Sequence, residues 1–136
     1  MSKLLLAVSD RWVPDARVDV IGDFVQRLGG SVLAVHVAYG SEANGAGVQP
    51  GERLIDRIAQ QLRSKNVKTE TLFLFSDNIG AAILKTAEEH RATVIVLGLS
   101  DKGVLTRLIE GNISQEVIRG ARIPILLLPP DWMNPI

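Results

Sequence analysis

The chain has 136 residues, the usual size of one domain with its own core, and 46% of them are hydrophobic, which excludes a disordered segment. Its 15 Lys and Arg residues balance 15 Asp and Glu residues, so the formal net charge is zero, which excludes a general nucleic-acid binder with a basic surface. The absence of cysteine excludes disulfides, thiol nucleophiles and thiolate metal sites, and it fits a cytoplasmic protein.

The first part of the chain alternates apolar runs with an amphipathic segment. Residues 3–8 and 31–38 are continuous apolar runs, which indicate strands covered on both faces. Between them, Pro14 is well placed to begin a helix and Gly29 to end it. Residues 40–51 are rich in glycine and indicate a surface loop; they lack the Gly-Lys-Ser/Thr ending of a P-loop, so we assign them no phosphate-binding role.

The same alternation continues to the end of the chain. Amphipathic patterns predict helices over residues 52–65 and from the capping residue Asn78 to about His90. Strands are expected over residues 68–75, 94–97 and 125–128. Because strands alternate with helices, the sequence predicts one α/β domain over residues 1–136, with a doubly wound parallel sheet and helices on both faces.

The strand ends of such a sheet are where ligands bind, at the point where the strand order reverses. Residues 8–10 and Gly98 follow two of the expected strands and would meet there. Gly111 and Asn112 open a further helix, in which Asn112 is a good N-cap and Gln115 completes a capping box. The N–H groups at a helix start are unpaired and attract anions, so we expect an anion site formed by these segments.

Four stretches carry a resemblance to a known family: LLLAVSD, VLAVHV, SDNIGAAILKTAEEHRATVIVLG and GLSDKGVLTRLIEGNISQEVIRGARIPILLLP. From Leu4 to Leu128 the chain resembles a universal stress protein of the small single-domain type. The resemblance implies a Rossmann-like five-stranded parallel sheet in the order 3-2-1-4-5, usually in a dimer. Many members of the family bind ATP or a related adenine nucleotide, and others bind none.

The family's nucleotide motif is Gly-x-x-Gly, nine residues, then Gly-Ser or Gly-Thr. Gly98 matches its first glycine and Gly111 its third, whereas Asp101 replaces the second glycine and Asn112 the hydroxyl residue. An amide donates a hydrogen bond as a hydroxyl does, so Asn112 is tolerable. A carboxylate about 4 Å from a phosphate oxygen costs about 1 kcal/mol in water and about 4 kcal/mol at a partly screened surface, so Asp101 favours a ligand with fewer phosphates than ATP.

Other positions match the family in part. Nucleotide-binding members carry an Asp directly after the first strand; here Ser9 holds that place and Asp10, a candidate Mg²⁺ ligand, follows. Val37 matches the position whose backbone recognises adenine. The resemblance therefore implies nucleotide contacts from Val8, Ser9, Asp10, Val37, Leu97, Gly98, Ser100, Lys102, Gly111, Asn112, Ile113 and Ser114.

Three classes of function stay open. The first is a non-enzymatic stress or signalling protein that binds an adenine nucleotide, with Mg²⁺ as a further ligand. The second is a dimeric interaction protein of the same family that binds no nucleotide. The third is an enzyme, which is disfavoured because Ser9 has no nearby His–Asp pair and His36 is expected to be a packed, hydrogen-bonded residue of a buried strand, although slow ATP hydrolysis stays open.

The last expected strand supplies the predicted partner. Ile125, Leu126, Leu127 and Leu128 are all apolar, and Pro124 and Pro129 flank them, as suits an edge strand. An uncovered apolar edge invites association, so we expect a two-fold homodimer through it, with the tail over residues 130–136 covering the partner. The chain shows no signal peptide and no apolar run of membrane-spanning length, so we expect no membrane insertion.

Overall fold

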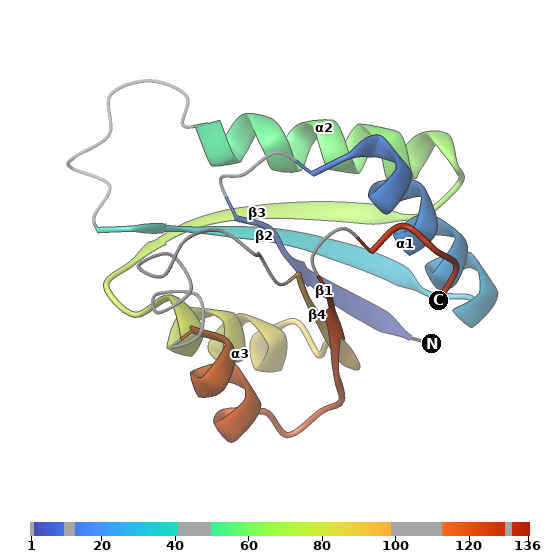
Figure 1. Cartoon of the computed structure of the whole chain (residues 1–136). Helices are drawn as coiled ribbons and strands as arrows, with labels where there is room; N and C mark the ends of the chain where they lie inside the picture. The colour runs from blue at the N-terminus through green and yellow to red at the C-terminus, as the bar shows by residue number, and fades with distance from the viewer. Residues whose placement is uncertain (1, 10–12, 41–49, 99–112, 130–131) are drawn as a thin grey trace.

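The computed structural model of the chain describes residues 2–9, 13–40, 50–98, 113–129 and 132–136 (Figure 1). In chain order the elements are β1 (Lys3–Ala7), α1 (Asp15–Leu28), β2 (Ser31–Tyr39), α2 (Pro50–Ser64), β3 (Thr69–Ser76), α3 (Ile79–Glu89), β4 (Val94–Gly98), a helix over residues 113–120, and β5 (Ile125–Leu128). Each strand and helix expected from the sequence is present within a residue or two. The expected helix start at Gly111 and Asn112 lies outside the described residues.

The five strands form one parallel sheet in the order β3-β2-β1-β4-β5, which confirms the predicted fold. The chain moves from β1 outward to β2 and β3, and then returns to place β4 on the other side of β1. The strand order therefore reverses between β1 and β4, and we call the carboxyl ends of these two strands the switch point. Both β3 and β5 are edge strands.

Helices cover both faces of the sheet, with α1 and α2 on one face and α3 and the helix over residues 113–120 on the other (Figure 1). Because side chains alternate along a strand, Leu4 and Leu6 pack under α1 and α2, whereas Leu5 packs under α3. The inner face of α2 buries Leu54, Ile55, Ile58 and Leu62, as expected of an amphipathic helix. Within the described residues, no helix is long and apolar enough to cross a membrane.

Local signals in the sequence set the helix ends. Gly29 ends α1 in the left-handed region at φ 66°, where a residue without Cβ meets no steric penalty. The Asn78 side chain accepts a hydrogen bond from the Ala81 amide at 3.1 Å and so caps α3. The expectation that Pro14 begins the helix is wrong by one residue. Its ψ of 143° is extended, so Pro14 takes the N-cap position and α1 begins at Asp15.

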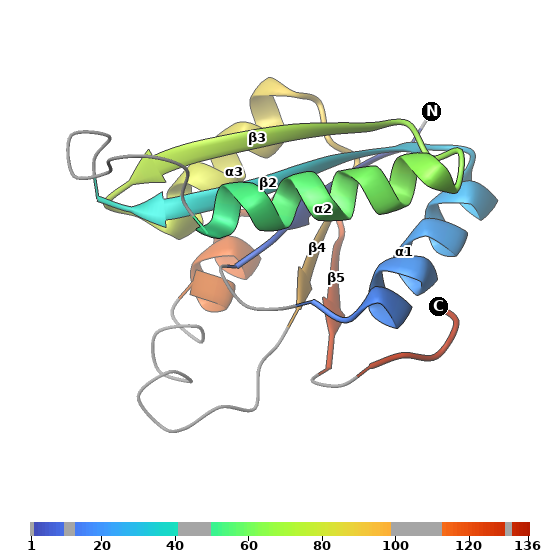
Figure 2. The same ribbon diagram turned by 90° about the horizontal axis from the view of Figure 1, so that it is seen from above.

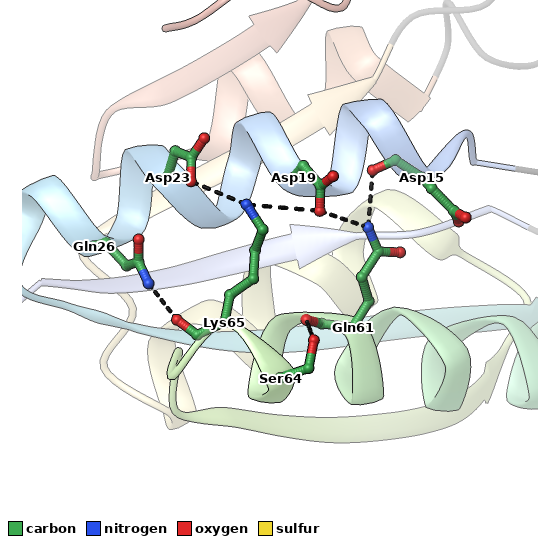
Figure 3. Close-up of polar contacts among 7 residues, drawn as sticks. All are labelled: Asp15, Asp19, Asp23, Gln26, Gln61, Ser64 and Lys65. Atoms are coloured by element: carbon green, nitrogen blue, oxygen red, sulfur yellow. Dashed lines mark hydrogen bonds and ion pairs between the residues drawn. The ribbon is translucent and has the colours of Figure 1, made fainter.

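A polar ladder joins α1 to α2 (Figure 3). Asp15, Asp19 and Asp23 recur every four residues on one side of α1, and they face Gln61 in α2 and Lys65, which directly follows α2. Gln61 Nε2 donates to the Asp15 carbonyl and to Asp19 Oδ1, both at 2.8 Å. The hydrogen bond from Lys65 Nζ to Asp23 at 3.0 Å, together with the charge of Asp19, raises the pKa of Lys65 above its ordinary value against an opposing desolvation.

The end of the chain folds back along α1 of its own subunit (Figure 2). Trp132 and Ile136 pack against the cluster that includes Val18 and Val25, and the Arg27 guanidinium donates to the Ile136 carbonyl. Two apolar side chains of the tail therefore pack against the chain's own core, and the expectation that the tail covers a partner stays a prediction.

Candidate functional site

The carboxyl ends of β1 and β4 lie side by side, since Ala7 pairs with Leu97 in the parallel register. The side chains of Val8 and Leu97 are buried, at 7% and 5% exposure, whereas the next residues, Ser9 and Gly98, are exposed. The switch point therefore brings together two exposed residues, Ser9 and Gly98, and Gly98 has no side chain of its own to restrict approach to its backbone.

A buried histidine fixes the end of β1. The Val8 amide donates to the Val35 carbonyl at 2.8 Å, and His36 Nδ1 is hydrogen-bonded to the Val8 carbonyl, also at 2.8 Å. The imidazole stacks on Phe73 at a centroid distance of 5.5 Å, and it lies directly against the backbone of Gly51 at the start of α2. The prediction that His36 is packed and hydrogen-bonded is confirmed, and the Val8 carbonyl is its partner.

The backbone of Val37 is directed toward the side of β1. Hydrogen-bonding groups alternate along a strand, and in β2 the Ser31 amide donates to Ser2 while the Val35 carbonyl accepts from Val8. Val37 is two residues beyond Val35, so its backbone groups point the same way, past the last residue of β1. Its side chain is buried at 8% exposure on the α3 face. The placement suits the predicted role of this backbone, which stays a prediction.

The helix over residues 113–120 lies on the same face as Leu97. Ile113 packs against the cluster that contains Leu97 and Val37, and Ser114 is half-buried in the first turn that the structure describes. A Cβ built on Gly80 of α3 would lie 2.7 Å from the Glu116 carboxylate, so these two helices are in close contact. The other predicted ligand residues, Asp10, Ser100, Lys102, Gly111 and Asn112, lie outside the described residues, as does Asp101.

One cation beside the switch point was not singled out from the sequence. Arg17, in the first turn of α1, is half-buried, and a Cβ built on Gly98 would lie 3.4 Å from its Nη1. Nothing in the local sequence around Arg17 signals this contact, because it depends on how α1 packs over the end of β4. Among the described residues, no group of three or more metal-ligating side chains is close enough to hold a metal ion.

A five-stranded parallel sheet in this order, with two described helices on each face, defines the chain as a doubly wound, Rossmann-like α/β protein. The Universal stress protein family model matches residues 1–129, and the chain belongs to this family.

Solved structures share the fold at low sequence identity. A universal stress protein from Archaeoglobus fulgidus aligns with a TM-score of 0.75 and 20% identity, over 93% of this chain and 98% of that one. A structure of the universal stress protein from the same organism in complex with dAMP aligns with a TM-score of 0.67 and 19% identity, over 93% of this chain and 97% of that one. A universal stress protein in complex with cAMP aligns with a TM-score of 0.69 and 13% identity, over 93% of this chain and 95% of that one. A search of curated protein sequences finds no match.

Proposed function

We propose that this protein binds an adenine nucleotide at the switch point and acts as a non-enzymatic, homodimeric stress or signalling protein of the cytoplasm. The observation that carries the proposal is the pairing of the β1 and β4 ends, where Gly98 presents bare backbone within the fold of this family. The structural relatives solved with dAMP and cAMP support a nucleotide with a single phosphate.

Recognition of the base would come from β2. The Val37 backbone lies on the β1 side, beyond the last residue of that strand, and it can read the edge of an adenine ring without any side-chain contact. The buried bond between His36 and the Val8 carbonyl would keep the end of β1 in place beside it.

The phosphate would lie toward Gly98. A glycine at this position lets phosphate oxygens approach backbone amides closely. Ser114 lies in the first described turn of the helix over residues 113–120, which packs on the same face of the sheet as Leu97. Because Asp101 follows closely in the sequence, AMP or cyclic AMP should bind more tightly than ATP. Mg²⁺, with Asp10 as its candidate ligand, would matter only for the longer phosphate chains.

The dimer would form through β5. This strand is at the sheet edge, and Leu127 keeps 38% of its surface exposed although its neighbours Ile125 and Leu126 are partly buried. Should the site bind no nucleotide, this edge would remain as the basis of a family-type interaction protein. The replacements at Ser9, Asp101 and Asn112 are the observation that favours this second candidate.

Calorimetric titration with AMP, cyclic AMP, ADP and ATP, each with and without Mg²⁺, tests the proposal. Wild-type protein should bind AMP, and Gly98→Ala should weaken that binding several-fold, because the new methyl group lies where the phosphate approaches. Gly22→Ala, in α1 against Leu62, is the matched control and should leave the affinity unchanged. No heat of binding with any of the four nucleotides would reject the proposal in favour of the interaction protein.

A further inference from the structure

The Arg17 side chain connects three parts of the chain at the switch point. Its Nη2 donates to the Pro129 carbonyl at 2.9 Å and its Nε donates to the Trp132 carbonyl at 3.2 Å. Its Nη1 lies beside Gly98, and Gly98 itself pairs with Leu128 in the β4–β5 register. One guanidinium therefore spans the end of β4 and the start of the C-terminal tail.

The tail holds this guanidinium in one orientation. The Trp132 amide donates to the Pro129 carbonyl at 3.2 Å, so the two residues whose carbonyls Arg17 contacts are also hydrogen-bonded to each other. Trp132 and Ile136 pack against the core beside α1, and Leu128 of β5, directly before Pro129, is buried in the same core cluster. A planar guanidinium with two of its nitrogens fixed has no rotational freedom left for the third. Nη1 is thus oriented before any ligand arrives.

The charge of Arg17 is available to an anion. Among the residues that the structure describes, no carboxylate forms an ion pair with Arg17, and its Nη1 has no hydrogen-bonding partner. The two acidic residues that flank Arg17 on the same helix have other partners: Asp15 is paired with Arg57 at 2.6 Å and Asp19 with Lys65 at 3.6 Å. A half-buried, unneutralised guanidinium next to exposed glycine backbone has the geometry of a phosphate contact.

The docked tail carries an uncompensated polar group. Trp132 Nε1 is buried without a hydrogen-bonding partner among the described residues, which lowers the stability of the docked state. A ligand that strengthens the contacts of Arg17 would therefore favour the docked tail.

We propose that Arg17 is a phosphate-recognition residue of the switch point that the C-terminal tail orients, so that phosphate binding and tail docking stabilise each other. The inference rests on the proposed function, and it adds a residue and a conformational readout to it. Because coupling between two sites is reciprocal, a phosphate that binds Nη1 more tightly when the tail is docked must also favour the docked tail.

Two readouts test the proposal in the full-length protein. The first is the affinity for AMP compared with adenosine, which has no phosphate. The second is the exchange protection of the Trp132 indole Nε1–H in NMR spectra, assigned with the Trp12→Phe variant. Wild-type protein should bind AMP about tenfold or more tightly than adenosine, the factor expected of one charge-assisted hydrogen bond, and AMP but not adenosine should raise the indole protection.

Variants then separate the charge from the geometry. Arg17→Ala should lose about tenfold or more in AMP affinity and keep its affinity for adenosine. Arg17→Lys keeps the charge but lacks the planar fork, so it should bind AMP with intermediate affinity and show no AMP-induced protection of the indole. Arg63→Ala removes the same charge from α2, where the guanidinium donates to the Thr69 carbonyl and takes no part in holding the tail, and it should change AMP affinity by less than about threefold.

The outcomes distinguish this inference from the proposed function. AMP binding that Arg17→Ala leaves unchanged, or indole protection that AMP leaves unchanged, would overturn the inference while nucleotide binding stands. Equal affinities for AMP and adenosine in the wild type would also overturn it. Wild-type protein that binds neither compound would overturn both.

Discussion

The contact between His36 and Gly51 allows a sharp test of how the end of β1 is held. A Cβ built on Gly51 would lie 2.6 Å from His36 Cε1 and closer still to Cδ2 and Nε2, a separation that no real contact shows. The ring cannot turn aside without loss, because Val8 holds one edge and Phe73 stacks on its face. Gly51→Ala should therefore displace the imidazole and break its bond to the Val8 carbonyl.

The expected cost follows from these contacts. Forcing a methyl group into a packed site costs about 1–3 kcal/mol, and leaving the Val8 carbonyl without its partner costs about 1–3 kcal/mol more. The gain in helix propensity from Gly to Ala offsets up to about 1 kcal/mol. We therefore expect Gly51→Ala to lower the free energy of unfolding by about 2–4 kcal/mol, measured by urea denaturation.

A double-mutant cycle isolates the cause. In a His36→Ala background the ring is absent, so Gly51→Ala should be neutral or slightly stabilising there. Gly22→Ala serves as the matched helix control, because its new methyl group would lie 3.2 and 3.3 Å from the Leu62 and Lys65 side chains, well beyond the 2.6 Å or less at Gly51. Equal stability of Gly51→Ala and wild type, or the same loss with and without His36, would refute the reasoning.

Three further predictions concern other parts of the fold. Asn78→Ala removes the α3 cap and should lower the free energy of unfolding by about 1 kcal/mol in thermal denaturation, with Asn78→Asp as a control that keeps the cap; an unchanged midpoint would show that the cap is not stabilising. The raised pKa of Lys65 predicts a stabilisation that is complete below its unfolded pKa of about 10.4 and is lost as pH rises through the higher folded pKa. Urea midpoints from pH 8 to 11.5 should thus fall more steeply in wild type than in Asp23→Asn, and parallel curves would contradict it. Leu127→Lys places a charge on the β5 edge and should convert the proposed dimer to monomer in sedimentation, whereas a wild-type monomer at micromolar concentration would reject the dimer itself.

The fold could be predicted from the sequence because its signals are local and repeated. The apolar runs of β1 and β2 and the helical spacing in α2 each identify an element without reference to the rest of the chain. Gly29 then fixes one helix end by its left-handed conformation, and Asn78 fixes another by the hydrogen bond that its side chain accepts. The strand order itself came from the family resemblance, because alternating strands and helices permit several doubly wound orders.

The candidate site could be predicted only in part. The ends of β1 and β4 follow from the strand pattern, and the structure brings Ser9 and Gly98 to the same edge of the sheet. Contacts between distant segments leave no periodic signal, so the bond from His36 to Val8 and the position of Arg17 were not foreseen. For the same reason, no pattern in the sequence indicates that Trp132 packs against α1 of its own chain.

Backbone amide chemical shifts measured as AMP is added to ¹⁵N-labelled protein test the central claim most directly. The account predicts saturable shifts at Ser9, Val37 and Gly98, with Ser64 at the far end of α2 unaffected. Shifts confined to other parts of the molecule, or none at millimolar AMP, would contradict nucleotide recognition where the β1 and β4 strands end.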